Sequence, residues 1–140
     1  NCTRAQAVTF LWRAAGKPEP KSAGNPFTDV ADTTDTNWYY KAVLWAVEQG
    51  ITTGTTAATF SPDETCNRAQ IVTFLYRHAG KPAANGGTFS DVTADQYYYQ
   101  AVQWATANEI TNGIGDGKFA PETDCSRGHI VTFLYRDLAK

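Results

Sequence analysis

Three arginines are the residues whose type and position most clearly suggest a chemical role. Arg4, Arg68 and Arg127 each stand at the first position of a predicted helix. A cation there opposes the positive end of the helix dipole by about 0.3–1 kcal/mol, so we expect a group that offsets it. A guanidinium beside free helix N-terminal amides forms an anion site, suited to a phosphate or an acidic sugar substituent. The alternative is a structural ion pair from Arg68 or Arg127 to Asp29 or Asp91.

Two triplets of aromatic residues, at 38–40 and 97–99, could provide stacking surfaces for sugar rings. An aromatic face packs against the apolar C–H side of a pyranose while its polar tip stays in water. Three consecutive helical residues cannot all point inward, so at least one of each triplet should be exposed, with core packing favoured for the others. Trp45 and Trp104 fall on an apolar helical stripe and are predicted to lie in the core.

Two glycines and two aspartates recur at matching places outside the predicted helices. We expect Gly54 and Gly113 to supply a backbone conformation that their loop requires, with close ligand approach as a second use. Asp29 and Asp91 can cap local turns whether or not a ligand binds. The sequence leaves structural and binding roles open for all four.

Catalysis is not expected, because no Ser/His/Asp or Cys/His set recurs with the rest of the pattern. Cys2, Cys66 and Cys125 form no CxxC pair and lack histidines at zinc-ligand spacing, so we expect no metal and no cofactor. Each cysteine precedes a predicted helix cap, where burial as a small apolar residue is expected. An intermolecular bridge through an unpaired thiol is the alternative.

The composition describes an ordinary globular chain of one domain. Its 140 residues are 42% hydrophobic and include 18 aromatic side chains, enough to fill a core. With 12 basic and 14 acidic residues, the net charge of −2 argues against nucleic acid as a partner. No apolar run approaches the roughly 18 residues of a membrane span, so membrane insertion is not expected. The sequence starts at Asn1 and contains no Met, which suggests an internal or processed piece.

Internal repeats organise the chain. The sequence ITTG at 51–54 returns as ITNG at 110–113, 59 residues later. The Phe-x-Asp-Val motif at 27–30 returns at 89–92, an offset of 62 residues. The segment that opens the chain matches the one that starts at Cys66, 64 residues later. The chain therefore contains two and a half repeats: the second half of one at 1–18, and full repeats at 27–82 and 89–140.

Each full repeat is predicted to be two helices separated by a glycine-containing loop. The first helices, at 38–49 and 97–108, carry apolar residues at helical spacing. The second helices start after caps such as Thr3 and Asn67, each followed by a glutamine that completes a capping-box pattern. Because one helix pair cannot bury its apolar faces alone, we expect the repeats to share a core in a single all-α unit, 1–140.

Three motifs make this sequence resemble the S-layer homology (SLH) repeat. They are Phe-x-Asp-Val before an aromatic-rich helix, Gly-x5-Phe-x-Pro in the loop, and Thr/Asn-Arg-Ala-Gln at the start of the second helix. The likeness covers nearly the whole chain outside the linkers at 17–26 and 81–88. The third copy departs from the pattern, because Ser126 and Arg127 are followed by Gly128 and His129.

The resemblance implies a secreted bacterial module located at the cell surface, cell wall or S-layer. The implied fold is a pseudo-threefold bundle of helix-loop-helix repeats, with short extended segments at the Phe-x-Asp-Val motifs. Grooves between the repeats would bind secondary cell-wall polysaccharide, including polymers with acidic substituents, and hold a protein on the envelope without a covalent bond. Carried over to this sequence, the groove residues are Arg4, Arg68, Arg127, Asp29, Asp91, Trp38, Tyr97, Gly54 and Gly113.

A function from a different class is extracellular protein–protein assembly. The chain begins inside a repeat, so the helix face with Val8, Phe10, Leu11 and Trp12 has no partner helix upstream. A neighbouring chain could supply that helix, and the modules would then self-associate head to tail through the incomplete repeat. A simple boundary of the sequence explains the same observation and is the interpretation that we favour.

Overall fold

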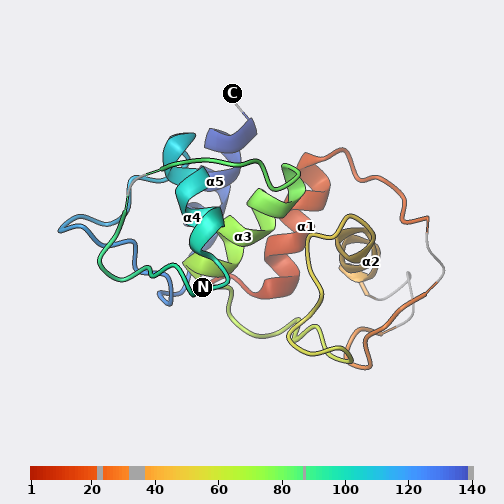
Figure 1. Ribbon diagram of the computed structural model, residues 1–140. Coiled ribbons are helices and arrows are strands. Elements are labelled where there is room, and N and C mark those ends of the chain that lie inside the picture. The colour runs from red at the N-terminus through yellow and green to blue at the C-terminus, as the bar shows by residue number, and fades with distance from the viewer. Residues whose placement is uncertain (22–23, 32–36, 87, 139–140) are drawn as a thin grey trace.

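The fold is helical throughout the part of the chain that the computed structural model describes, residues 1–21, 24–31, 37–86 and 88–138 (Figure 1). The helices are α1 (Arg4–Ala14), α2 (Tyr40–Glu48), α3 (Arg68–His78), α4 (Tyr99–Ala107) and α5 (Arg127–Leu138). Only isolated β-bridges, and no strand, occur in these ranges. The predicted all-α class is therefore confirmed. None of these helices is long and apolar enough to cross a lipid bilayer.

The second helix of each repeat begins where the capping pattern predicts. At α1, the Thr3 hydroxyl accepts a hydrogen bond from the Gln6 amide, and the Gln6 side chain accepts one from the Thr3 amide. Asn67 and Gln70 form the same reciprocal pair at α3. These boxes satisfy amides that have no partner within the helix, so local sequence alone defines both helix starts.

The three second helices, α1, α3 and α5, contact one another and form the centre of the molecule. Where their N-terminal ends meet, the three cysteines close a ring of backbone hydrogen bonds. The Cys2 amide donates to the Cys125 carbonyl (2.8 Å), Cys66 to Cys2 (2.7 Å) and Cys125 to Cys66 (2.9 Å). Each repeat thus gives one donor and one acceptor, which is the pattern expected of a pseudo-threefold axis.

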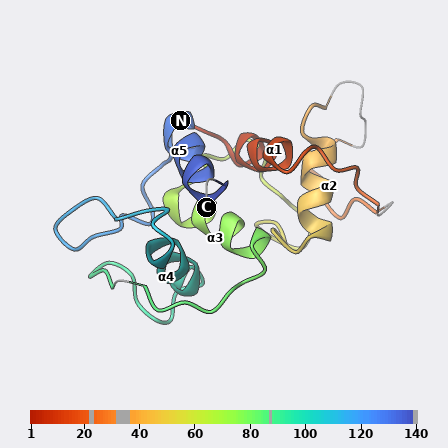
Figure 2. The same ribbon diagram turned by 90° about the horizontal axis from the view of Figure 1, so that it is seen from above.

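The first helices pack outside this bundle, and each covers the second helix of the preceding repeat. Helix α2 packs on α1, and α4 packs on α3 (Figure 2). The face of α1 expected to lack a partner is therefore covered, with Val8 and Leu11 fully buried and Phe10 and Trp12 half-buried against the core. No helix upstream is needed to cover this face, because the covering helix α2 belongs to the following repeat.

The predicted core tryptophans are confirmed, since Trp45 of α2 and Trp104 of α4 are both buried. Trp45 lies against the His78 ring, and Trp104 lies against the Tyr76 ring, at centroid distances of 5.7 and 5.9 Å. The Phe-x-Asp-Val motifs differ from expectation in detail: a bend at 28–30 and a turn at 90–91 replace extended backbone. The extended pairing lies instead just before the second helices, where Thr3 bridges Thr65.

The cysteine side chains are buried at the axis, as predicted, and all three are free thiols. Burial raises the pKa of the Cys66 and Cys2 thiols and raises that of Cys125 to about 11. A thiolate would have to lose its hydration in an apolar site, so the folded chain keeps these groups protonated.

This burial predicts a loss of stability at alkaline pH. The thiol of Cys125 ionises near its ordinary value of 9.0 in the unfolded chain but only near 11 in the folded one. The folded state therefore binds more protons in that range, and the free energy of unfolding should fall as pH rises from 9 to 11. Urea unfolding followed by circular dichroism at several pH values measures the slope.

A Cys125→Ala variant is the control for that slope. It should be less stable than the parent at pH 7, by about 1 kcal/mol, because it leaves a small void. Its stability should depend less on pH between 9 and 11. An identical slope in the variant would show that other groups cause the alkaline effect.

Candidate functional site

Three grooves lie on the central bundle, and we name each after the helix that forms its wall. The α1 groove is lined by Gln6, Thr9, Phe10, Arg13, Trp38 and Arg127. The α3 groove is lined by Arg4, Thr52, Thr53, Gly54, Thr55, Gln70, Thr73, Phe74, Arg77 and Tyr97. The α5 groove is lined by Arg68, Thr111, Asn112, Gly113, His129, Thr132, Phe133 and Arg136. The structure therefore brings most of the sequence-predicted site residues into three related sites.

The three grooves share one arrangement of residues, and each groove is lined by residues from more than one repeat. Each wall helix gives a threonine, a phenylalanine and an arginine at matching positions, and a neighbouring bundle helix gives its first arginine. Arg4 of α1 enters the α3 groove, Arg68 of α3 enters the α5 groove, and Arg127 of α5 enters the α1 groove. The arginines therefore pass from helix to helix in the same cyclic order as the backbone hydrogen bonds of the cysteines, because both follow the pseudo-threefold axis.

Within the described residues, only the α3 groove combines the two arginines with both a loop wall and an aromatic residue at its rim. Its loop wall is 52–55, and its aromatic rim is Tyr97, which precedes α4. The α1 groove has an aromatic rim, Trp38, but no loop residue among its described lining. The α5 groove has the loop wall 111–113 but no aromatic rim among its described lining. With a volume of about 290 Å³, the α3 groove is close to the lower limit of ligand pockets, roughly 300 Å³.

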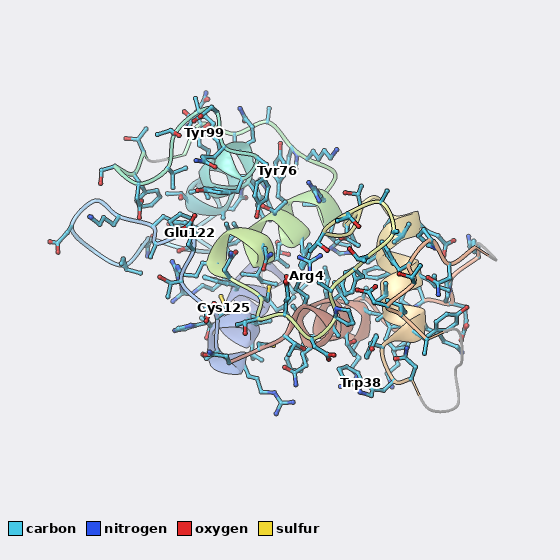
Figure 3. The ribbon with its side chains drawn as sticks, turned by 90° about the horizontal axis from the view of Figure 1, so that it is seen from below. Arg4, Trp38, Tyr76, Tyr99, Glu122 and Cys125 are labelled. Atoms are coloured by element: carbon cyan, nitrogen blue, oxygen red, sulfur yellow. The ribbon has the colours of Figure 1, made fainter. Side chains whose placement is uncertain are left out.

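The arginines at the helix starts are held by loop carbonyls and aromatic rings. Arg4 Nε donates to the Phe60 carbonyl at 2.9 Å, and Arg68 Nε donates to the Phe119 carbonyl at 2.8 Å. The Arg4 guanidinium carbon lies 4.8 Å from the Phe60 ring centroid and 5.5 Å from that of Phe74. Burial lowers the pKa of Arg4 and Arg68, but a guanidinium stays charged. Figure 3 shows Arg4 in the interior of the molecule, beside α3.

The N-terminal amides of α1 and α3 are not free to bind an anion, which corrects part of the expected site. The amides of Arg4 and Ala5 donate to the carbonyls of Glu64 and Pro62, at 2.8 and 3.1 Å. In α3, the amides of residues 68 and 69 donate in the same way to the carbonyls of residues 123 and 121. An anion in the α3 or α5 groove, which Arg4 and Arg68 enter from these helix starts, must therefore be recognised by side chains and not by the helix ends.

Arg127 differs from the other two because its side chain is exposed. Its guanidinium carbon lies 5.9 Å from the Phe10 ring centroid, the longest of the recorded cation–π distances. No loop carbonyl holds it as Phe60 holds Arg4, because the α1 groove has no loop wall in the described chain. The α1 groove is consequently the least preorganised of the three.

Asp29 and Asp91 clamp the end of each loop. The Asp29 carboxylate accepts hydrogen bonds from the amides of Phe60 (2.9 Å) and Ser61 (2.8 Å). Asp91 accepts equivalent bonds from the amides of Phe119 and Ala120. The alternative ion pair to an arginine does not form in the described chain, where the recorded salt bridge joins Lys41 and Glu19.

The clamp and the arginine act on the same loop residue from opposite sides. Asp91 accepts from the Phe119 amide while Arg68 donates to the Phe119 carbonyl. Burial acts to raise the pKa of Asp91, but the hydrogen bonds from Phe119 and Ala120 outweigh it and hold that pKa below its usual range. The aspartates thus position the loop wall and lie outside the lining of all three grooves.

The loop glycines are required by backbone geometry. Gly54 has φ +90°, and a Cβ placed there would lie 2.5 Å from both the Phe27 ring and the Thr59 carbonyl. Gly113 has φ +81°, with a Cβ position 2.6 Å from Phe89 and from the Lys118 carbonyl. Both glycines line their grooves, so the structural requirement and a place beside a ligand coincide.

The aromatic rims stand out from the surface. Trp38 is 53% exposed and Tyr97 is 61% exposed. Each rim ring meets the next residue edge-on, with Trp38 against Tyr39 and Tyr97 against Tyr98, at a centroid distance of 5.0 Å. Because Trp38 and Tyr97 are exposed, the prediction of at least one exposed ring per triplet is confirmed. Tyr98 is buried. Figure 3 shows Trp38 at the edge of the molecule.

A second arginine lines each groove and is not among the residues predicted from the sequence. Arg13, Arg77 and Arg136 stand nine positions after the first arginine of their helices, and each lines the groove of its own helix. Nine positions turn a helix by about 900°, so the two arginines point to opposite sides and serve different grooves. Their recurrence in all three copies was the available signal.

The electrostatics of the grooves favour an anionic ligand. Each groove has two arginines in its lining and no carboxylate. Arg77 and Arg136 each donate one hydrogen bond to a backbone carbonyl, of Ile51 and Ile110, at 3.2 Å. A guanidinium has five N–H donors, so these arginines retain donors for a ligand.

Because the Asp91 carboxylate accepts hydrogen bonds from two loop amides, we expect Asp91→Asn to destabilise the chain. The amide keeps the shape but weakens two charge-assisted hydrogen bonds, at an expected cost of about 1–3 kcal/mol. Because the pKa of Asp91 is lowered by folding, its contribution is present at neutral pH and is lost as pH falls below its ordinary value of 3.8. Thermal unfolding at pH 7 and at pH 3 measures both effects.

Asp116→Asn is the matched control for this clamp. Asp116 is exposed and has φ +56°, a conformation that asparagine accepts, so its variant should unfold like the parent. Equal stability of the Asp91 and Asp116 variants would contradict the clamp.

Comparison with known proteins agrees with this architecture. The S-layer homology domain family matches residues 26–72 and 88–130. An endoglucanase from Bacillus sp. (strain KSM-635) is 32% identical over 88% of this chain, which spans 13% of that protein. Two proteins of Acetivibrio thermocellus match the whole chain: cell surface glycoprotein 1, 28% identical, and a cellulosome-anchoring protein, 25% identical.

The chain spans no more than a third of the length of these relatives, 6% of the surface glycoprotein and 32% of the anchoring protein. The family match covers most of both full repeats, including the loops that build the groove walls and the first turns of α3 and α5. From this match and the recurring motifs, we conclude that the chain belongs to the S-layer homology domain family.

Proposed function

We propose that this chain is a non-catalytic module that anchors a larger protein to the bacterial cell envelope by binding an anionic cell-wall polysaccharide. Its family and the names of two relatives, a cell surface glycoprotein and a cellulosome-anchoring protein, support a place at the cell surface and an anchoring role. One relative is named an endoglucanase, but this chain corresponds to only 13% of it. The finer proposal, a polysaccharide ligand, rests on the chemistry of the α3 groove.

The observation that carries the proposal is the combination of charge and aromatic surface in the α3 groove. Arg4 and Arg77 face one space with no carboxylate in its lining, and Tyr97 exposes its ring at the rim. Paired guanidinium groups suit phosphate or carboxylate substituents, and an exposed ring suits the C–H face of a sugar. Hydroxyl and amide groups from the loop and from Gln70 add hydrogen-bonding partners for sugar hydroxyls.

The other grooves share this chemistry but not its completeness. The α1 groove lacks a loop wall, and the α5 groove lacks an aromatic rim, among the described residues. A polysaccharide with repeating units would engage several such sites at once, which raises overall affinity without new contacts. We assign the α3 groove the largest share of binding because its partners are held in place before the ligand arrives.

The first test compares the two aromatic rims. Purified chain is sedimented with bacterial wall sacculi, before and after acid extraction of the secondary polysaccharide. Tyr97→Ala should weaken sedimentation at least tenfold, about 1.4 kcal/mol of binding free energy, whereas Trp38→Ala should have a smaller effect. Both rings are exposed, so neither variant should alter the fold, which circular dichroism checks.

Two outcomes would overturn this assignment. Undiminished sedimentation with extracted sacculi would show that the ligand is not the secondary polysaccharide. Equal losses in the two variants would show that the α3 groove is not the dominant site.

The second test concerns charge. Arg77→Gln removes a cation from the α3 groove and keeps a side-chain donor, whereas Arg13→Gln does the same in the α1 groove. Binding of the parent should weaken as salt rises, because partly exposed charges are screened. The Arg77 variant should bind several-fold more weakly at low salt and with a shallower salt dependence, and the Arg13 variant should stay close to the parent. An unchanged salt dependence in the Arg77 variant would exclude it from ligand recognition.

A further inference from the structure

Another hollow in the surface lies beside the loop that Asp91 clamps, and its charge is opposite to that of the grooves. It is formed by Asp91, Gln96 and Tyr98 on one side and by residues 120–123 on the other, and we call it the Tyr98 pocket. Its lining contains the carboxylates of Asp91 and Glu122 and no arginine, lysine or histidine. Its volume of about 450 Å³ lies within the usual range of ligand pockets, roughly 300–1,000 Å³.

The Tyr98 pocket is separate from the three grooves. Arg68, which lines the α5 groove, donates a hydrogen bond to the Phe119 carbonyl, whereas Asp91 accepts one from the Phe119 amide. The pocket therefore lies on the aspartate side of this loop, and the α5 groove lies on its arginine side. No residue of the pocket lining also lines a groove.

The hydroxyl of Tyr98 has no partner in the described chain. Tyr98 is only 6% exposed, and its hydroxyl forms no hydrogen bond among the described residues. Every fully buried side-chain polar atom in that part of the chain is paired, so the hydroxyl belongs to the small part of Tyr98 that reaches the pocket. Because an unpaired polar group in a mostly buried site is costly, a ligand that pairs with this hydroxyl gains free energy.

The groups around this hydroxyl are negatively charged. Burial raises the pKa of Tyr98, and the charges of Glu122, Asp91 and Asp95 raise it further, so the phenol stays protonated at neutral pH. Glu122 is exposed and forms no hydrogen bond or ion pair in the described chain. In Figure 3, Glu122 lies close to α4, the helix that starts after Tyr98. Asp91 accepts two amide hydrogen bonds, but a carboxylate has about four acceptor positions and keeps its charge.

The same combination occurs in the first full repeat. Tyr39, Asp29 and Asp63 stand at positions that match the tyrosine and the two carboxylates of the Tyr98 pocket. Burial, and then the charges of Asp63 and Asp29, raise the pKa of Tyr39 as well. Tyr39 is only half-buried, so we base the inference on the better enclosed Tyr98.

The acceptors in the pocket suit an ammonium group better than a metal ion. Within the residues that the structure describes, no three carboxylate, histidine or cysteine side chains converge in a way that could hold a metal ion. Calcium and magnesium require about six or more oxygen ligands. A primary ammonium has three N–H donors, and Glu122, Asp91 and the Tyr98 hydroxyl together can accept them.

The rest of the lining suits a sugar ring. The side chains of Gln96 and Thr123 can donate and accept hydrogen bonds, as sugar hydroxyls require. Ala120 and Pro121 add apolar surface for the C–H groups of the ring. The aliphatic stem of a lysine side chain would leave Gln96 and Thr123 without partners, so a protein ligand fits less well.

We propose that the Tyr98 pocket binds a sugar that carries a free ammonium group. The ammonium would donate hydrogen bonds to the Glu122 carboxylate and the Tyr98 hydroxyl, and the charge of Asp91 would add to the attraction. The arginines of the three grooves repel such a cation, so this ligand and an anionic polysaccharide would occupy different sites. The inference does not rest on the proposed function, since it requires no ligand in any groove.

The test is a nuclear magnetic resonance titration of the ¹⁵N-labelled chain. The probes are the β-1,4-linked trimer of glucosamine and the matching trimer of N-acetylglucosamine, which has no charge. The titration is done at about pH 6, where amino groups are protonated. The amides of Phe119 and Ala120 report on the pocket, because both donate to Asp91. They should shift in a saturable way with the glucosamine trimer, and the acetylated trimer should bind about tenfold more weakly or less.

Three variants test the residues of the site. Glu122→Gln and Tyr98→Phe keep the shape of their side chains, and each should weaken binding of the glucosamine trimer by about fivefold or more. Glu109→Gln is the matched control, because it removes an exposed carboxylate that is not in the pocket lining, and it should bind like the parent. Circular dichroism checks that all three variants are folded.

Four results would overturn the proposal. The first is the absence of saturable shifts at Phe119 and Ala120 with the glucosamine trimer, and the second is equal binding of the acetylated trimer. The third is an unchanged affinity in Glu122→Gln. The fourth is tighter binding of Nα-acetyl-lysine methylamide than of the glucosamine trimer, which would make a protein side chain the ligand. None of these results depends on wall sedimentation, so failure here leaves the α3 groove assignment to its own tests.

Discussion

The arrangement of this protein depends on the ring of three backbone hydrogen bonds that joins Cys2, Cys66 and Cys125. Backbone donors and acceptors buried away from water must be paired, and here each repeat satisfies one group of each neighbour. The ring can close only when all three segments are present. Because each cysteine lies two residues before the first helical arginine, the ring also sets where α1, α3 and α5 start relative to one another.

The positions of the grooves follow from this relative placement of the three helix starts. The first arginine of each bundle helix crosses to the neighbouring repeat, where it holds a loop carbonyl that an aspartate clamp keeps in place. The second arginine of the same helix points to the opposite side of the helix and lines the groove of its own helix. A shift of one helix would therefore disturb two grooves together. The arginine side chain and the loop are each held by several partners before any ligand binds, so less conformational entropy is lost on binding.

The boundaries of the sequence repeat and of the spatial unit do not coincide. In sequence, a first helix belongs with the second helix that follows it, but in space it packs on the second helix that precedes it. Every groove and every covered helix face consequently draws on more than one repeat. This interlocking couples neighbouring repeats more strongly than contacts at their ends alone would, as expected of an array whose units cannot bury a core alone.

Local patterns determined the elements of this fold, and long-range packing determined their roles. The starts of α1 and α3, the core positions of Trp45 and Trp104, the burial of the cysteines and the family all followed from spacing within the sequence. Capping and helical periodicity act within a few residues, so one sequence carries that information. The structure alone showed that loop carbonyls occupy the N-terminal amides of α1 and α3, and that Asp29 binds loop amides instead of an arginine. It also showed that Arg77 shares a groove with Arg4 and that, among the described residues, one face of α5 is not covered by another helix. Each of these facts joins residues far apart in the chain, and such pairings arise only when the pseudo-threefold ring brings the repeats together.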